Sequence, residues 1–439
     1  MKPRHDRVAL RHPALRLPRH RATTAHLGAI YPFQAEAGSG GRGVYLGVDL
    51  HAGRGAFCFE PFTAYADGEL TATNLLVLGE IGAGKSSAVK TFLYRAAGTV
   101  LGPGQRHRFV AVLDPKGEYG PLAAALGIPT VRLYPGGNDR LNPLAPAPGI
   151  TDPDELAARR AGLAVALAGA TLGRDLTAVE EAAVGWATAA ISGRAGAPPT
   201  LADLVGVLAA PTAAMTATAG MSDDELARGA LDVRFGLSKL LDRQLRGMLD
   251  GASTVALDRH GRGLVVDLSA LYHDHDALNV VMIAVTAWLQ ALLANPAAAA
   301  EHLQAYQVWD ECWALTGRLQ SARYMQASQK LARAYGITNI AVTHRISDLR
   351  AQHDDGTAAA KVTEGLLADS QVRILFRQPP DQVAEAKRTL GLTSIEAERL
   401  PHLPRGRALW KLPSRSTFVD HVIGPDEQRL CDTDERLAV

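Results

Sequence analysis

Short apolar runs of strand length recur along most of the chain. Glycine or polar residues bound these runs, which lie at 75–78, 109–113, 130–133, 264–268, 306–309, 339–342 and 372–376. Strands that are apolar at nearly every position are typical of a parallel sheet that helices cover on both faces. The pattern predicts an α/β fold with a doubly wound, mostly parallel sheet.

A long helical pattern interrupts these runs. Residues 151–262 are rich in Ala and Leu, as in DELAARRAGLAVALAGA, with apolar positions at helical spacing and capping residues at Thr151 and Thr200. We predict an inserted all-helical subdomain over this range. It divides the α/β core into 71–150 and 263–413.

The two ends of the chain have a different character. Short alternating segments at 44–48 and 56–60 predict a small β lead-in over 23–70, and the acidic, polar residues 414–439 predict a loose C-terminal tail. Residues 1–22 read as a basic disordered arm, because the first 21 residues hold six Arg and one Lys against one Asp, a net charge of +6. This arm is either a solubilising terminus or a contact for nucleic acid, anionic lipid or an acidic partner.

Composition bears on the partners and the cellular compartment of the protein. The 46 Lys and Arg nearly balance the 45 Asp and Glu, so net charge gives no sign of a nucleic-acid or membrane partner. Three widely spaced cysteines, Cys58, Cys312 and Cys431, fit a reducing compartment. The most apolar stretch, 280–293, is shorter than the roughly 20 residues that span a bilayer, which indicates a buried helix. We therefore expect a cytoplasmic protein with no transmembrane segment of its own.

A glycine-rich motif follows the first apolar run. In LLVLGEIGAGKSSAV the pattern GxxxxGKS stands directly after a strand and before a helix, which is the context of a phosphate-binding loop. Lys85 is expected to reach the β- and γ-phosphates and Ser86 to bind Mg²⁺. The alternative is a flexible turn with a solvated Lys. The predicted nucleotide site comprises Gly79, Glu80, Ile81, Gly82, Ala83, Gly84, Lys85, Ser86 and Ser87, with ATP and Mg²⁺ as cofactors.

Two later strands end in polar side chains that suit the same site. The segment YQVWDEC delivers Asp310, which can hold the water shell of Mg²⁺, and Glu311, which can polarise an attacking water. The segment NIAVTH delivers Thr343 and His344, which are candidates for sensing the γ-phosphate. Alone, each pair has a structural explanation as a strand end or a helix cap.

Five further motifs follow one another along the chain. LDPKGEY, RLNPL, VVDLS, WDECWAL and VTHRISDL resemble signature segments of the HerA/FtsK superfamily of motor ATPases, and within it the conjugal-transfer ATPases of type IV secretion systems, of the TraC or VirB-four type. The resemblance covers about 24–413 and implies a RecA-like P-loop NTPase core. We expect a motor-only version of the family, without the large N-terminal domain usual there. At position 344 this chain has His where the family has Gln.

The resemblance also implies a ring assembly. In a homo-hexamer an arginine completes the neighbouring chain's site, and Arg373 and Arg377 are the candidates, with Arg345 behind them. A structural salt bridge explains each of them equally well. Off the membrane a monomer or dimer is also expected, and the implied partners are membrane-embedded type IV secretion components at the inner face of the cell membrane.

The turn DPKGEY leaves its own alternatives open. Asp114, Lys116 and Glu118 follow the strand beside the phosphate loop, where they either act near the nucleotide or only form the turn.

Three functions of the protein remain open: a motor that energises a conjugative type IV secretion system, a DNA-translocating coupling or segregation ATPase that contacts DNA, and a nucleotide-gated interaction module.

Overall fold

The structure is a computed structural model. It describes residues 38, 41–98, 108–146, 150, 152–194, 196–242, 245–255, 258, 260–293, 303–316, 318–347 and 358–432. The basic arm predicted at 1–22, the capping residue Thr151 and the end of the VTHRISDL motif lie outside the described residues.

One eleven-stranded sheet forms the centre of the molecule, in the order β2-β1-β11-β10-β9-β3-β8-β7-β4-β6-β5. The strands are β1 (Val44–Asp49), β2 (Ala56–Phe59), β3 (Leu75–Leu78), β4 (Phe109–Asp114), β5 (Thr130–Arg132), β6 (Gly263–Asp267), β7 (Ala305–Trp309), β8 (Ile337–Thr343), β9 (Val372–Leu375), β10 (Arg407–Lys411) and β11 (Ser416–His421). All pairings from β9 to β5 are parallel. The predicted α/β fold with a mostly parallel, doubly wound sheet is confirmed.

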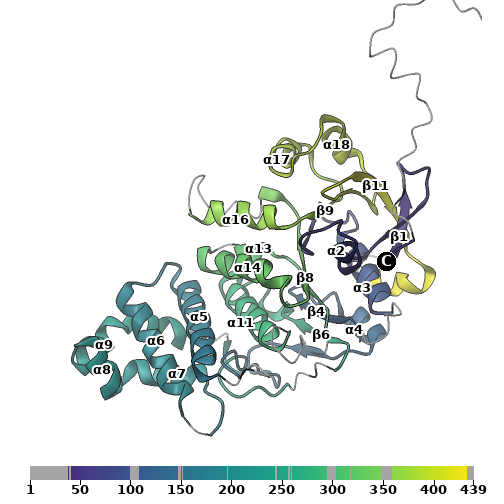
Figure 1. Ribbon diagram of the computed structural model, residues 1–439. Helices are drawn as coiled ribbons and strands as arrows, with labels where there is room; N and C mark the ends of the chain where they lie inside the picture. Colours follow the sequence, from purple (N-terminus) through teal and green to yellow (C-terminus); the bar gives the residue numbers. More distant parts are fainter. Residues whose placement is uncertain are drawn as a thin grey trace, which may run out of the picture.

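Helices cover both faces of this sheet (Figure 1). Alternate residues of β3 point to opposite faces: Leu75 and Val77 join one apolar core cluster, and Leu76 and Leu78 join the other. The first cluster includes side chains of α2 (Pro61–Ala66), α3 (Lys85–Ala97), α4 (Gly120–Leu126) and α19 (Gln428–Cys431). The second includes side chains of α11 (His275–Leu293), α13 (Trp313–Thr316), α14 (Leu319–Ala332), α16 (Ala358–Asp369), α17 (Pro380–Leu390) and α18 (Ser394–Arg399).

Helices fill the region predicted as an insertion. They are α5 (Pro153–Leu172), α6 (Ala178–Ser192), α7 (Leu201–Ala209), α8 (Ala213–Ala219), α9 (Asp223–Gly229) and α10 (Leu231–Ser238), and they lie together at one side of the molecule (Figure 1). Thr200 caps α7 as expected, and its partner in the capping box is Asp203. The helical part is not isolated, because α5 packs on α11 and α14 and shares their apolar core.

The apolar helix α11 is long enough to cross a membrane by length and composition. Among the described residues, α7 and α8 give a second such segment only if they are counted as one span across a bend of 62°. Most of α11 is buried within the molecule, and Val281, Ile283 and Val285 are fully inaccessible. This is the buried core helix that the sequence predicts.

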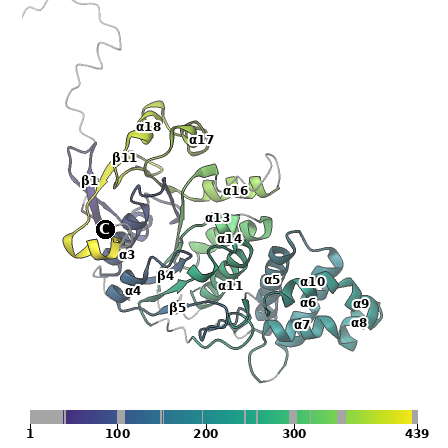
Figure 2. The same ribbon diagram turned by 180° about the vertical axis from the view of Figure 1, so that it is seen from behind.

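The prediction of a loose C-terminal tail is wrong. Part of the expected loose tail forms β11, which lies inside the sheet between β1 and β10 (Figure 2). The strands expected at 44–48 and 56–60 are present as β1 and β2, and they extend the same sheet. The reason for the wrong prediction is a long-range pairing: β11 pairs with β1, which lies near the other end of the described chain, and a local pattern does not reveal such a partner.

Candidate functional site

The polar side chains of the site lie at one edge of the sheet. Parallel strands present their carboxyl ends on the same side, and ligands of open α/β sheets bind there. In register, Leu78 of β3 pairs with Thr343 of β8 and with Leu375 of β9, and Leu113 of β4 pairs with Trp309 of β7. The segments that follow these strands therefore meet, and the motifs predicted from separate parts of the sequence form one site.

The loop after β3 has the backbone of a phosphate-binding loop. Gly82 and Gly84 adopt left-handed φ angles of 75° and 108°, which side chains rarely allow. Gly79 has no room for a side chain, since a Cβ atom there would lie 2.5 Å from the Cβ atom of Phe376. The helix α3 starts at Lys85 without any side-chain cap. Its first amide groups have no partner within the helix, so they can bind an anion.

Lys85 lies beneath this loop with its side chain buried. Its ammonium group donates to the carbonyl oxygens of Gly79, at 2.5 Å, and Glu80, at 3.1 Å, and contacts Nδ1 of His344 at 3.0 Å. Burial lowers the pKa of Lys85 to about 8, although the negative charge of Glu311 acts in the opposite direction. The lysine is thus held at the loop by exchangeable hydrogen bonds, which suits a group that binds phosphate.

Asp310 has the properties of a ligand for a hydrated cation. The residue is 2% exposed, and its Oδ2 atom is buried without a hydrogen-bond partner among the described residues. Burial raises the pKa of Asp310 to about 7, and the charge of Glu311 adds to the increase. A buried carboxylate oxygen without a partner fits a magnesium ion or its water shell. Ser86, in the first turn of α3, fits the second protein ligand predicted for Mg²⁺.

Glu311 is held by several donors. Its Oε1 atom pairs with the ammonium group of Lys116 and, at 2.8 Å, with Nε2 of His344, and its Oε2 atom accepts from the indole of Trp313. Burial acts to raise its pKa, but the hydrogen bonds from His344 and Lys116 and the charge of Lys116 outweigh that effect and hold the pKa below its usual value. Glu311 has a φ of 52°, an uncommon conformation that occurs often at functional sites.

His344 connects the two charged groups of the site. Its Nδ1 atom faces Lys85 and its Nε2 atom faces Glu311. A neutral imidazole with its hydrogen on Nε2 satisfies both contacts, because Nδ1 then accepts from the ammonium group and Nε2 donates to the carboxylate. Thr343 is buried, with an Oγ1 atom that has no partner among the described residues. The sensor role of these two residues stays a prediction.

The turn DPKGEY divides into two parts. Asp114 accepts hydrogen bonds from the backbone of Gly117, Glu118 and Tyr119, at 2.8, 3.1 and 2.8 Å, so the turn-forming interpretation holds for it. Lys116, in contrast, reaches across from this turn to Glu311. Only Lys116 of the three predicted residues thus contacts the catalytic candidates.

The predicted arginines are not gathered at the phosphate loop. Arg377 pairs with Glu80 of the loop. Arg373 donates to the carbonyl oxygens of Leu367, Ser370 and Leu390, at 3.2, 3.2 and 3.1 Å, which favours the structural explanation for this side chain. Arg345 is exposed. An action of any of them on a neighbouring chain stays a prediction.

Sequence reasoning missed two contributors to the site. Trp313 binds Glu311, and its position two residues later in WDECWAL was the available signal. The backbone amide of Gly406 donates to the carbonyl of Ala83, at 3.0 Å, and so supports the loop from the C-terminal part of the chain. No local pattern marks this second contact.

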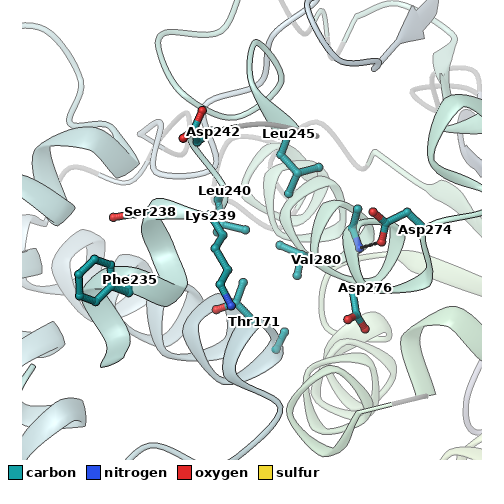
Figure 3. Close-up of a pocket in the computed structure, with 12 residues that line it drawn as sticks. Thr171, Phe235, Ser238, Lys239, Leu240, Asp242, Leu245, Asp274, Asp276 and Val280 are labelled. Carbon is teal, nitrogen blue, oxygen red and sulfur yellow. Dashed lines mark hydrogen bonds between the residues drawn. The ribbon is translucent and has the colours of Figure 1, made fainter. Parts of the chain in front are cut away.

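A cavity of about 530 Å³ lies elsewhere, between α5, α10 and the start of α11 (Figure 3). Thr171, Phe235, Lys239, Asp274 and Asp276 are among the side chains that line it. None of the predicted site residues lines this cavity. The cavity is therefore separate from the phosphate-binding loop and the carboxylates beside it.

Comparison with known proteins supports one fold assignment. No protein-family model and no curated protein matches the chain. Among solved structures, VirB4 of Thermoanaerobacter pseudethanolicus is similar over 90% of this chain and 100% of its own, with a TM-score of 0.67 and 19% sequence identity. A structure described as an ATPase has a TM-score of only 0.34 and 12% identity, over 93% of this chain and 96% of its own, too low to indicate a shared fold. The chain therefore has the RecA-like P-loop fold of VirB4, as the motif order predicts.

Proposed function

We propose that this protein is an ATPase that energises a type IV secretion system. The observation that carries the proposal is the convergence of Lys85, Asp310, Glu311 and His344 at the carboxyl edge of a sheet with the VirB4 fold. Sequence motifs far apart along the chain predict these four residues as one hydrolytic site. A nucleotide-gated module without turnover would not need the Glu311 carboxylate.

Each residue then has a stated part in hydrolysis. The loop amides and Lys85 would hold the phosphates, and Ser86 and Asp310 would hold the ion. When bound, the ATP complex of Mg²⁺ supplies the phosphoryl group and the Lewis acid. Glu311 would orient and polarise the attacking water. The partly buried position of these groups limits the access of bulk water, which strengthens their electrostatic effect.

Steady-state ATP hydrolysis by the purified full chain tests the proposal. We expect turnover that depends on Mg²⁺, is absent in Lys85→Ala, and falls by a factor of about 100 or more in Glu311→Gln, because general base catalysis contributes that much. Thermal unfolding of the variants serves as the control for folding. Turnover in Glu311→Gln equal to that of the wild type would remove the proposed base.

Protein concentration and DNA separate the more detailed hypotheses. A homo-hexameric motor that acts at a conjugative secretion channel predicts a specific activity that rises with protein concentration and does not need DNA. Strong stimulation by single- or double-stranded DNA at low salt favours a DNA translocase instead, with the basic N-terminal arm as a contact for phosphates. Constant specific activity of a strict monomer argues against the ring.

A further inference from the structure

The Glu311 carboxylate is fully engaged within the protein. Lys116 and His344 share its Oε1 atom, and Trp313 occupies its Oε2 atom. The side chain is only 3% exposed. A carboxylate has about four acceptor positions, so three donors leave little capacity for a water molecule. In this arrangement Glu311 is poorly placed to polarise an attacking water.

The same network reaches the phosphate-binding lysine. His344 uses one ring nitrogen for Glu311 and the other for Lys85. Lys85 spends its remaining hydrogens on the loop carbonyls of Gly79 and Glu80. An ammonium group has three donors, so Lys85 has to give up at least one of these contacts to bind a phosphate. Charge-assisted bonds to phosphate are stronger than bonds to a neutral imidazole, which favours that exchange.

We propose that Lys116, His344 and Trp313 form a resting clamp on Glu311, which opens when Lys85 leaves His344 for a bound phosphate. This proposal depends on the proposed ATP hydrolysis and adds a way in which the protein regulates it. Without Lys85, Nδ1 of His344 loses its donor and the ring loses its fixed orientation. The bond from His344 to Glu311 then weakens. Lys116 is a positioning residue in this scheme, since it acts through Glu311.

The position of Lys116 supports a switching contact. It lies on a turn that Asp114 fixes through three backbone hydrogen bonds. Its side chain is 24% exposed, whereas that of Glu311 is 3% exposed, so the lysine can swing toward solvent while the carboxylate stays. Lys116 also lies 3.4 Å from Nε2 of His344, which brings both partners of the same oxygen together. A purely structural ion pair would stay closed in every nucleotide state.

Trp313 provides a readout that does not depend on turnover. The emission of the wild type minus that of Trp313→Phe isolates this indole among the five tryptophans. We expect a saturable change in this difference when Mg²⁺ and a non-hydrolysable ATP analogue are added. Lys116→Met should shift the emission before any nucleotide is present, and Lys116→Arg should restore most of the wild-type value. His344→Ala should bind the analogue, as calorimetry measures, without the emission change.

Hydrolysis gives the second readout. Lys116→Met should raise the basal rate by about threefold or more, because it frees an acceptor position on Glu311 for the attacking water. Lys239→Met, on an exposed lysine that lines the separate cavity, is the matched control and should leave both readouts at wild-type values.

The outcomes separate the two proposals. A wild-type emission response in both His344→Ala and Lys116→Met would overturn the clamp, and so would a lower rate in a folded Lys116→Met. Absence of turnover above Glu311→Gln in the wild type would overturn the proposed ATPase. The analogue-induced emission change would still test the clamp in that case.

Discussion

The parallel and antiparallel parts of the sheet differ in burial and in what they contribute. Every residue of β3, β4, β7 and β8 is buried, because helices cover both faces of these parallel strands. The antiparallel strands β1, β10 and β11 each keep partly exposed positions. The two parts meet at β9, which is parallel to β3 and antiparallel to β10.

The parallel part of the sheet positions the residues proposed for hydrolysis, and the antiparallel part supports the phosphate-binding loop. The residues proposed for hydrolysis follow the carboxyl ends of parallel strands, where neighbouring side chains converge. The antiparallel part contributes a backbone contact instead: Gly406, just before β10, bonds to Ala83 of the loop, and His421 of β11 bonds to Gly406. Local motifs therefore mark the chemistry, whereas the support depends on segments from both ends of the chain.

The first prediction concerns a methyl group added to the phosphate-binding loop. In Gly79→Ala the new Cβ atom would lie 2.5 Å from the Cβ atom of Phe376, so loop and strand have to move apart. Overpacking costs about 1–3 kcal/mol, and we expect affinity for an ATP analogue to fall by about 10- to 100-fold in calorimetry.

Gly82→Ala is the matched control for that change. Its Cβ atom would meet open space, but the φ of 75° costs about 1 kcal/mol in a residue with a side chain. We expect a loss of affinity of about fivefold. Equal losses in both variants would show that the contact with Phe376 does not shape the loop.

The second prediction concerns the stability cost of Asp310. Burial is the main cause that raises the pKa of Asp310 to about 7 in the folded protein, above its ordinary value of 3.8. As pH rises from about 4 to 7, the unfolded chain loses this proton first, so stability falls across that window and stays lower above it. Asp310→Asn removes the titration. Urea unfolding of the nucleotide-free variant at pH 8 should give about 3 kcal/mol more stability, with little difference near pH 4.

The stability gain of Asp310→Asn should accompany a loss of Mg²⁺-dependent turnover. Stabilising changes at a functional site often remove function, because the site holds strained or unpaired groups. A variant that is less stable than the wild type at pH 8 would mean that a partner satisfies the buried Oδ2 atom in solution.

The sequence predicted the parallel part of the molecule well. β3 is apolar at every position and β4 at all but its last, so the pattern alone indicates burial on both faces. It failed for β10 and β11, which are buried only at their central positions and whose pairing partners lie near the start of the chain or across a hairpin. Predictions that depend on pairing between distant segments need information that local patterns do not contain.

The candidate site also has residues that local motifs predict and contacts that depend on distant segments. The loop, Asp310 and Glu311 lie in contiguous motifs, each with a chemical reason for its spacing. The ion pair between Lys116 and Glu311 was not predictable, because it follows from the adjacency of β4 and β7, which the helical insertion separates in sequence. Arg373 was predicted as a catalytic candidate because the family resemblance implies an arginine that completes a neighbouring chain's site. Its three carbonyl partners depend on how α16 and α17 pack.

Arg373 gives the third prediction, at the strand where the two parts meet. Arg373→Met leaves three carbonyl oxygens without their charged donor, and hydrogen bonds to charged groups are worth about 2 kcal/mol in stability. Arg377→Met removes a partly exposed pair with Glu80 and should cost less than about 1 kcal/mol. Urea unfolding compares the two variants. A larger loss in Arg377→Met would reverse the assignment of the structural arginine.

The smallest expected effect concerns His421 in the antiparallel part. A neutral ring donates from Nδ1 to Gly406, at 2.9 Å, and accepts from the indole of Trp410, at 3.1 Å. Burial lowers the pKa of His421 to about 4, below its ordinary value of 6.5, so this stabilisation is present above pH 6.5 and declines as pH falls toward 4. We expect a loss of about 1 kcal/mol between pH 7 and 5.5 in urea unfolding, which His421→Phe abolishes. The slope has the opposite sign to that of Asp310, so Asp310→Asn serves as the control: it should leave the His421 contribution unchanged. The free energy of unfolding of His421→Phe should therefore change less between pH 7 and 5.5 than that of the wild type. An equal change in both would mean that the support of the loop by the antiparallel strands does not depend on a neutral His421.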